Sequence, residues 1–180
     1  QFMKMNVPHP KTEIITCADQ KTNIKFPFLV KEIHSSGGVG VHKVENKKDL
    51  DSLVNNKEFK KNNKSYIIQE LMDIRRDLRV TVVHNKVMSS YWRINTSKVW
   101  QKTSTNFGSK LDFNNIPVSI FDDIITITKN LGLEMAAYDI IFLNDNINNE
   151  YQILEVSPVH SSNPRIDNQE YLDYPGIFKK

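Results

Sequence analysis

Short apolar runs separated by glycines, prolines and charged residues dominate the hydrophobic pattern of the chain. Residues 26–31 form one such run, which contains Pro27 and ends at Lys31, and this pattern is typical of a buried strand. A serine- and glycine-rich segment at 35–40 separates it from a second predicted strand at 41–44. The two strands together indicate a hairpin with a long, flexible tip.

Runs rich in β-branched and aromatic residues predict further strands, which lie at 65–70, 78–83, 87–92, 136–143 and 151–156. A tight turn that contains Asn85 joins the second and third of these into a hairpin. An Asn- and Asp-rich turn joins the last two. Pro8 and Pro10 predict an extended segment before the first strand, because each disfavours helix at the residue before it.

Helical spacing occurs in two places. Asn46 is a suitable N-cap, and the apolar residues that follow it lie on one face of a short helix. Between 119 and 131 the apolar residues again recur at helical spacing, and Gly132 follows as the C-cap. Residues 55–64 are polar and predict a loop. Residues 96–115 show no period, and a connection of that length is often functional.

The order of these elements predicts an α+β fold built mostly from antiparallel sheets. Of the 180 residues, 39% are hydrophobic and 25% are charged, which is ordinary for a soluble domain. A net charge of only +3 argues against a nucleic-acid partner. No apolar run approaches the roughly 18 residues of a membrane span. No signal peptide is visible and Cys17 is the single cysteine, so we expect a cytoplasmic protein without a membrane partner.

The glycine-rich segment and the lysine before it are the first candidate site. Glycines let backbone N–H groups approach phosphate oxygens, and Lys31 supplies a positive charge. The segment matches neither the P-loop nor the dinucleotide-binding pattern. A plain flexible hairpin tip and a phosphate-binding loop therefore both remain open. His34, beside the loop, is either a phosphate contact or a loop histidine with no role.

Two carboxylates, Asp139 and Glu155, each lie within an apolar strand, where an unpartnered charge is costly. If the two strands pair, the carboxylates could face each other and hold a divalent metal, and oxygen ligands favour magnesium. The competing interpretation is a carboxylate bonded to an arginine or to backbone. Arg79 and Arg93, on the central hairpin, could bind phosphate or carboxylate oxygens, or form structural ion pairs with these acids.

Short motifs in a fixed order connect these signals between residues 7 and 158. They are Val-Pro-x-Pro-x-Thr at 7–12, Phe-Pro-Phe-Leu-Val-Lys at 26–31, Ser-Ser-Gly-Gly-Val-Gly-Val at 35–41, Ile-Ile-Gln-Glu-Leu-Met at 67–72, Arg-Asp-Leu-Arg-Val at 76–80, Tyr-Asp-Ile-Ile at 138–141 and Leu-Glu-Val-Ser-Pro at 154–158. In this order they resemble the ATP-grasp superfamily. The resemblance is nearest to the ribosomal-protein glutamyl ligases and other carboxylate–amine ligases of the glutathione-synthase type.

The resemblance implies two α+β lobes with mostly antiparallel sheets that clamp ATP. Residues 1–70 would form the small lobe with the glycine-rich loop, and residues 71–180 the large lobe with the metal-binding carboxylates. Relatives carry a substrate lobe and a first ATP lysine further upstream. Because both are missing here and the chain starts in what reads as the end of a helix, we expect a part of a longer protein.

The resemblance also implies a role for each candidate residue. Lys31 would contact adenine or the α-phosphate. The loop that closes over the phosphates would contain Ser36, Gly37, Gly38 and Gly40. The linker that offers backbone and polar groups to adenine would contain Gln69, Glu70, Leu71 and Met72. Asp77 would hold the ribose hydroxyls, and Thr103 would lie near the phosphates.

Arg93 and Lys102 would be the catalytic cations beside the transferred phosphoryl group, and Asp139 and Glu155 the magnesium ligands. Manganese could replace magnesium. The usual Glu-x-Asn metal motif reads Glu155-Val156-Ser157 here, and a serine hydroxyl is a poorer ligand than an amide oxygen. Ser157 is therefore a candidate third ligand, and Asn163 could compensate for it.

The implied function is an ATP- and magnesium-dependent carboxylate–amine ligase that acts through an acyl phosphate. The acceptor amine could belong to a peptide, and a homo-oligomer is compatible with the sequence. Two rivals keep the same fold. One is a kinase that phosphorylates a polyol or an inositol phosphate, and the other is a non-catalytic ATP-binding module.

Overall fold

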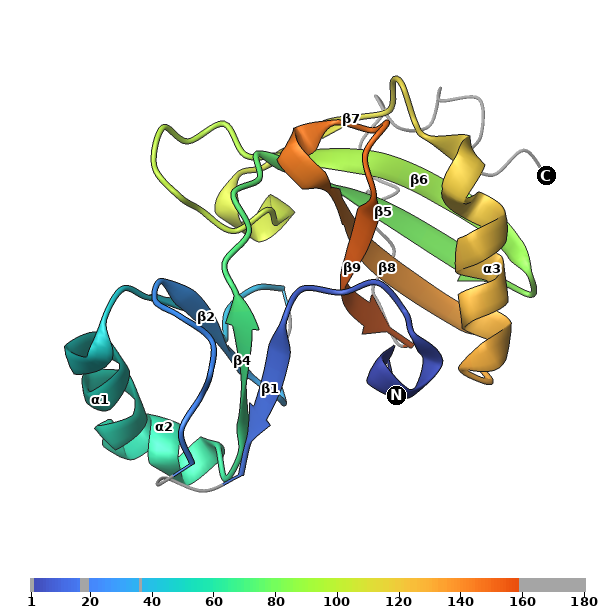
Figure 1. The fold of residues 1–180 in the computed structure, drawn as a ribbon. Coiled ribbons are helices and arrows are strands. Elements are labelled where there is room, and N and C mark those ends of the chain that lie inside the picture. Colours follow the sequence, from blue (N-terminus) through green and yellow to red (C-terminus); the bar gives the residue numbers. More distant parts are fainter. Residues whose placement is uncertain (1, 17–19, 36, 159–180) are drawn as a thin grey trace.

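The structure is a computed structural model that describes residues 2–16, 20–35 and 37–158. Two antiparallel sheets make up its framework (Figure 1). The small sheet has the order β1-β4-β2-β3, with β1 at Thr12–Ile15, β4 at Tyr66–Glu70, β2 at Phe28–Glu32 and β3 at Val41–Val44. The large sheet has the order β7-β6-β5-β8-β9, with β7 at Lys110–Asp112, β6 at Lys86–Ile94, β5 at Arg76–Val83, β8 at Met135–Phe142 and β9 at Tyr151–Ser157. The predicted α+β class is confirmed.

Alternation along the small sheet decides which face is buried, because successive strand residues point to opposite faces. Phe28, Val30 and Ile68 are buried in one apolar cluster. The same cluster contains Leu50 of α1 (Lys47–Asn55) and Phe59 of α2 (Lys57–Asn62). The two helices therefore cover one face of the small sheet, and the opposite face is left for the site.

Helix α2 corrects the prediction of a loop at 55–64. The Asn56 side chain accepts hydrogen bonds from the backbone N–H groups of Glu58 and Phe59, which caps the helix start. Phe59 is 7% exposed and anchors the helix to the core. A six-residue helix with one apolar anchor has too little periodicity to stand out in the sequence. The predicted cap of α1 by Asn46 is confirmed.

Strand β1 was not predicted, because it is a short edge strand in which only Ile15 is fully buried. The chain before it belongs to the other lobe. The 3-10 helix η1 (Phe2–Met5) and Val7 pack into the core of the large sheet, and the Ile153 backbone N–H donates to the Pro8 carbonyl at 2.8 Å. Residues 2–8 thus lie on the large lobe, although the sequence assigned them to the small one.

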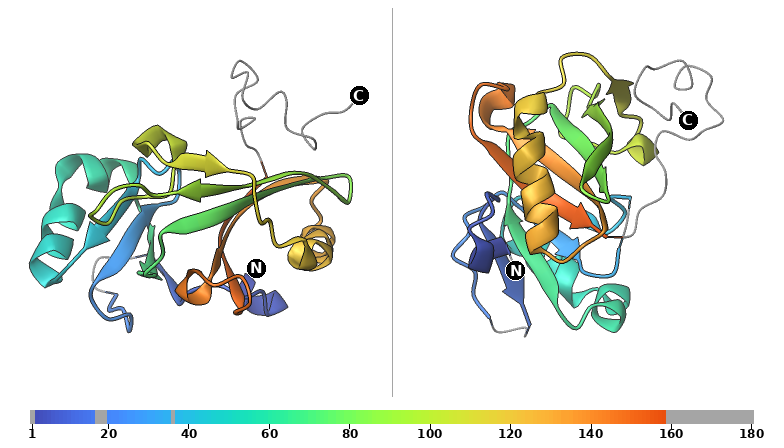
Figure 2. Two further views of the ribbon diagram at one scale, coloured as in Figure 1. Left: turned by 90° about the horizontal axis from the view of Figure 1, so that it is seen from above. Right: turned by 90° about the vertical axis from the view of Figure 1, so that its right-hand side faces the viewer.

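The large sheet packs one face against α3 (Phe121–Asn130), as Figure 2 shows. Ile124 of this helix is fully buried, and Thr128 bonds to the Tyr138 hydroxyl at 2.8 Å. The predicted hairpin of β5 and β6 is confirmed, and His84 and Asn85 of its turn have positive φ angles. Residues 96–115 contain two short elements that no sequence period indicated, η2 (Thr105–Phe107) and β7. Among the residues described, no helix combines the length and apolar character needed to cross a membrane.

Phe59→Ala should lower the free energy of unfolding of the chain by about 3 kcal/mol, because it removes the only fully buried side chain of α2 and leaves a cavity. Chemical denaturation monitored by circular dichroism measures this change. Val118→Ala is the control, since Val118 is 66% exposed and its truncation should cost less than about 0.5 kcal/mol. Equal stability of the two variants would show that α2 is not anchored through Phe59.

Candidate functional site

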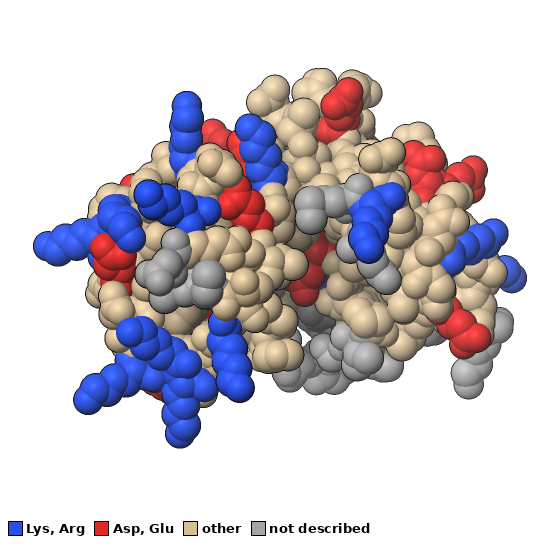
Figure 3. All heavy atoms as spheres, turned by 60° about the horizontal axis from the view of Figure 1, so that its bottom comes forward, with Lys and Arg blue, Asp and Glu red and all other residues tan. Residues whose placement is uncertain are grey.

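A crevice between the two sheets holds a cavity of about 570 Å³. Its walls come from β2, the glycine-rich loop, the connector after β4, the open face of the large sheet and the long loop after β6. Figure 3 shows the hollow between the two lobes, with acidic atoms at its floor. Nearly every residue that the sequence singled out in the described ranges contributes to this one crevice.

Strand register places the charged residues of the large sheet on the face opposite α3. Arg79 of β5 lies opposite Asp139 of β8, and Asp139 lies opposite Glu155 of β9. A bulge between Asp139 and Ile140 keeps both carboxylates on the crevice side while Ile140 and Ile153 stay in the core. The prediction that the two acidic strands pair is therefore confirmed, with the two carboxylates in register.

Arg93 lies between two buried carboxylates. Its guanidinium donates to both oxygens of Asp77, at 2.8 and 2.5 Å, and lies 2.8 Å from an oxygen of Asp139. Arg79 also donates to Asp139, and the Thr103 hydroxyl donates to Asp77 at 2.7 Å. Both interpretations of these arginines meet here, since they form structural ion pairs and also line the cavity.

Burial and ion pairing act in opposite directions on these groups. Burial disfavours the charged form of Asp139, but Arg93 and Arg79 outweigh it and hold the pKa of this carboxyl below its usual range. Burial raises the pKa of Asp77, against the attraction of Arg93. Burial also opposes the charge of Arg93, yet Asp139 and Asp77 raise its pKa further. The cluster therefore keeps Arg93 permanently charged.

Lys31 reaches the same region from the small sheet. It lies on the crevice face of β2, opposite Val41 and Ile67. Burial lowers the pKa of Lys31, and the charges of Glu155, Asp139 and Asp77 act to raise it. These three carboxylates belong to the other lobe and line the same cavity as Lys31, so the predicted convergence of Lys31 and the two strand acids on one crevice is confirmed.

Glu155 differs from the other acids because its side chain is exposed in the crevice. The Ser157 hydroxyl donates to its Oε1 at 3.1 Å. Within the described ranges no group of three or more His, Cys, Asp or Glu residues is arranged to hold a metal. The available donors are the two carboxylates and the Ser157 hydroxyl. Oxygen donors of this kind fit Mg²⁺ when phosphate oxygens complete the shell.

The glycine-rich loop lies over the crevice with Gly37 and Gly38 at positive φ, 62° and 79°. Gly40 is buried, and its N–H donates to the Ser35 hydroxyl at 2.8 Å. Lys102 reaches the loop from the large lobe, with Nζ 3.5 Å from the Val39 carbonyl. Ser36 and Asn163 lie outside the described residues.

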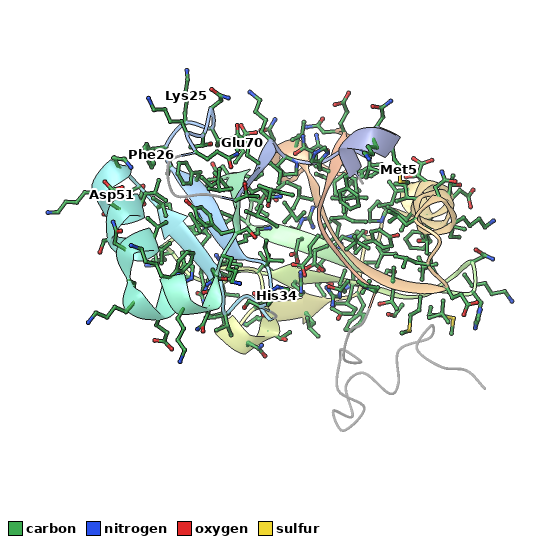
Figure 4. The ribbon with its side chains drawn as sticks, turned by 90° about the horizontal axis from the view of Figure 1, so that it is seen from below. Met5, Lys25, Phe26, His34, Asp51 and Glu70 are labelled. Carbon is green, nitrogen blue, oxygen red and sulfur yellow. The ribbon has the colours of Figure 1, made fainter. Side chains whose placement is uncertain are left out.

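All four residues of the predicted adenine linker line the cavity, Gln69 and Glu70 at the end of β4 and Leu71 and Met72 in the connector that follows. The amide of Gln69 donates to Thr12 at 3.1 Å, while its buried Oε1 has no hydrogen-bond partner within the described chain. Figure 4 shows Glu70 and His34 well apart on the small lobe, because Glu70 pairs with Phe28 at the start of β2 and His34 follows the end of β2. His34 is exposed and does not line the cavity.

Sequence reasoning missed several lining residues. Leu29, Ile74 and Leu154 give the crevice apolar walls, and Ser104 and Asn106 extend it towards the glycine-rich loop. Leu29 could have been found by strand alternation, since it lies between the core residues Phe28 and Val30. Ser104 and Asn106 lie in the segment without a period, where the pattern carries no such signal.

A family model for the RimK-like ATP-grasp domain matches residues 2–170 of the chain. The chain belongs to the RimK-like ATP-grasp family. Solved ATP-grasp structures share its fold. D-alanine–D-alanine ligase from Bacillus anthracis matches with a TM-score of 0.68 and 14% identity, over 88% of this chain and 54% of the ligase. No curated protein matches the chain in sequence.

Two further solved structures also share the fold of this ATP-grasp chain. The ATP-grasp ligase PsnB, complexed with a minimal precursor, matches with a TM-score of 0.58 and 15% identity, over 87% of this chain and 49% of PsnB. A RimK domain protein from Sphaerobacter thermophilus matches with a TM-score of 0.59 and 14% identity, over 86% and 54%. The chain thus spans about half the length of these relatives. At such identities the likeness shows the fold alone.

Asp77→Asn should lower the free energy of unfolding by about 3 kcal/mol, because Arg93 loses a charged partner in a buried site. Thr103→Val should cost only about 1 kcal/mol, since it removes one hydrogen bond. Urea denaturation measures both changes. Asp73→Asn is the matched control on an exposed carboxylate. A stability of Asp77→Asn equal to that of the control would mean that Arg93 does not depend on Asp77.

Proposed function

We propose that the crevice binds ATP with Mg²⁺ and that this chain is the nucleotide-binding part of a carboxylate–amine ligase. The observation that carries the proposal is the convergence of Lys31 from one lobe with Asp139 and Glu155 from the other, within a cavity of about 570 Å³. A nucleotide triphosphate needs cations for its phosphates and oxygen ligands for its metal. The crevice offers both, in a chain of a family that is defined by ATP binding.

Adenine would lie at the connector after β4. Leu29 and Leu154 provide apolar surfaces from opposite lobes, and the connector backbone provides polar groups at the edge of the base. The buried Oε1 of Gln69 is an acceptor without a partner in the described chain, which suits an exocyclic amine. This arrangement favours adenine over a base with a carbonyl at that position.

We propose for Asp77 a different role from the one that the resemblance implied. It is 1% exposed, and Arg93 and Thr103 already donate to its oxygens. It is therefore poorly placed to receive ribose hydroxyls. We assign it instead to holding Arg93 in one orientation, and we assign Thr103 to supporting Asp77 from the long loop.

Catalysis would rest on fixed cations rather than on a nucleophile. A substrate carboxylate oxygen would attack the γ-phosphorus of ATP. The bond between the γ-phosphorus and the ADP oxygen would break, and the acyl phosphate would form. Lys31, Arg93 and Lys102 line the cavity, and they would neutralise the charge of the moving phosphoryl group. An amine would then attack the acyl carbon, the bond from this carbon to the phosphate oxygen would break, and the amide would form with release of phosphate and a proton.

Bound Mg²⁺ would supply charge neutralisation on the phosphates. Glu155 and Asp139 would hold it, with Ser157 as the third candidate ligand. Asp139 shares its charge with two arginines, whereas Glu155 has no ion-pair partner among the described residues. We therefore assign the larger part of the metal affinity to Glu155.

The substrates are a carboxylate and an amine, and a peptide is a reasonable candidate for one of them because PsnB is seen with its precursor peptide. Phosphate and ADP release that requires both a carboxylate and an amine would support the ligase. Transfer of labelled phosphate to a polyol, without an amine, would show a kinase instead. ATP binding without turnover on either class would favour a non-catalytic module.

Glu155→Gln should remove the Mg²⁺-dependent part of ATP affinity and lower Mg²⁺-dependent ADP release on the order of 100-fold. Calorimetric ATP titrations with and without Mg²⁺ measure the first effect. The side chain is exposed, so the free energy of unfolding should stay unchanged. Glu150→Gln, on an exposed turn, is the control. Normal Mg²⁺ dependence in Glu155→Gln would remove Glu155 from the metal site.

Burial lowers the pKa of Lys31 below the ordinary lysine value of 10.5, so Lys31 loses its proton as the pH approaches 10.5. ATP affinity should therefore decrease about 10-fold, because the neutral amine no longer attracts phosphate. The sign follows from the charge: protonated Lys31 binds and deprotonated Lys31 does not. Lys31→Arg keeps its charge throughout this range and should weaken the pH dependence, leaving the part due to Lys102, whose pKa burial also lowers. Titrations at stepwise increasing pH test this. Parallel profiles for the two proteins would exclude Lys31 as the titrating group.

A further inference from the structure

Besides Lys102, two side chains of the long loop in the large lobe contact the glycine-rich loop of the small lobe. The Ser104 hydroxyl donates to the Gly37 carbonyl at 3.2 Å, and the Asn106 amide donates to the same oxygen at 3.4 Å. Ser104 is 9% exposed and also accepts a hydrogen bond from the backbone N–H of Asn106, which caps η2. One small helix thus presents both donors together. Figure 1 shows this loop reaching from the large sheet towards the small lobe.

Close packing supports the same contact. A Cβ atom at Gly37 would lie 2.5 Å from the Asn106 amide nitrogen. A Cβ atom at Gly38 would lie 3.3 Å from both the Lys102 side chain and the Phe107 ring. Lys102 in turn lies over the Phe107 ring, 4.6 Å from its centre. A side chain at 37 would therefore displace the Asn106 amide, and one at 38 would require Lys102 and Phe107 to shift by a few tenths of an ångström.

The same long loop is connected to the charged face of the large sheet. Thr103, next to Ser104, donates to Asp77, and Asp77 holds Arg93 through two hydrogen bonds. A shift of the long loop away from Gly37 would also displace the Thr103 hydroxyl from Asp77. The position of the glycine-rich loop and the position of Arg93 are thus set by adjacent residues of one segment.

We propose that Ser104 and Asn106 are positioning residues that fasten the glycine-rich loop at Gly37 over the triphosphate. The proposal rests on the proposed function, because it assumes that the phosphates lie under this loop. In the described chain the Ser104 and Asn106 side chains donate to the Gly37 backbone carbonyl at the edge of the cavity, and we assign them the positioning of that loop. Their effect on a ligand should therefore depend on whether it carries phosphates.

The direct test compares ATP with adenosine. The Ser104→Ala/Asn106→Ala double variant should bind ATP about 5- to 10-fold more weakly than the parent chain and bind adenosine equally well. Asn114→Ala, in the same long loop but bonded to Asp112, is the control and should bind both ligands like the parent chain. Asn106→Ala alone should show a smaller loss of the same kind, and its exposed side chain makes misfolding no concern.

A second measurement does not depend on ATP. Hydrogen exchange of the amides at 37–41 should become faster in the double variant and stay unchanged in Asn114→Ala. If the parent chain binds no ATP but hydrogen exchange at 37–41 is still faster in the double variant, the proposed function is wrong, while the contact of Ser104 and Asn106 with Gly37 is supported. Unchanged exchange together with unchanged ATP affinity would overturn the contact, and so would an equal loss of ATP and adenosine.

Glycine substitution gives an independent check. Gly37→Ala should lower ATP affinity at least as much as Asn106→Ala, because the added methyl group displaces the Asn106 amide. Gly132→Ala introduces alanine at a similar φ, 70°, but with nothing within 4 Å, so it should leave ATP affinity unchanged. Equal ATP affinities in the two alanine variants would overturn the proposal.

Discussion

The buried position of Arg93 between Asp77 and Asp139 is the constraint on which the site depends. A buried charge is tolerated only when it is paired, and here two carboxylates and two arginines balance one another. The balance makes the four groups a fixed charged surface rather than a set of mobile side chains. Lys31 and Glu155 take part in no ion pair within the described chain, and so they remain available to a ligand.

Antiparallel register makes this surface compatible with a stable core. Leu78 and Val80 of β5 point towards α3, while Asp77 and Arg79, which alternate with them along the strand, point into the crevice. A shift of one residue would bury the charges and expose the core, so the apolar cluster fixes the register. The packing that stabilises the large lobe therefore also aligns its functional groups.

Much of this could be predicted from the sequence, because strand alternation and isolated carboxylates are local signals. The pairing of the Asp139 and Glu155 strands and the capped helix at Asn46 follow from such signals. Helix α2 and strand β1 depend on tertiary contacts of single residues, and the sequence gives little sign of them. The same holds for Asp77, whose carboxylate is used by Arg93 and Thr103, two groups far from it along the chain.

The distribution of roles between the lobes explains why two weakly connected sheets can form one site. Within the described ranges, the small lobe contributes backbone, glycines and Lys31, whereas the large lobe contributes the ion-paired face and Glu155. Neither set alone balances the charge of a triphosphate and its metal, so a bound nucleotide favours the arrangement in which both sets meet. The contacts of Ser104 and Asn106 with Gly37 stabilise that arrangement in advance of the ligand. If the crevice binds ATP as proposed, pre-ordering of this kind would lower the entropic cost of binding and would hold the phosphates near Arg93.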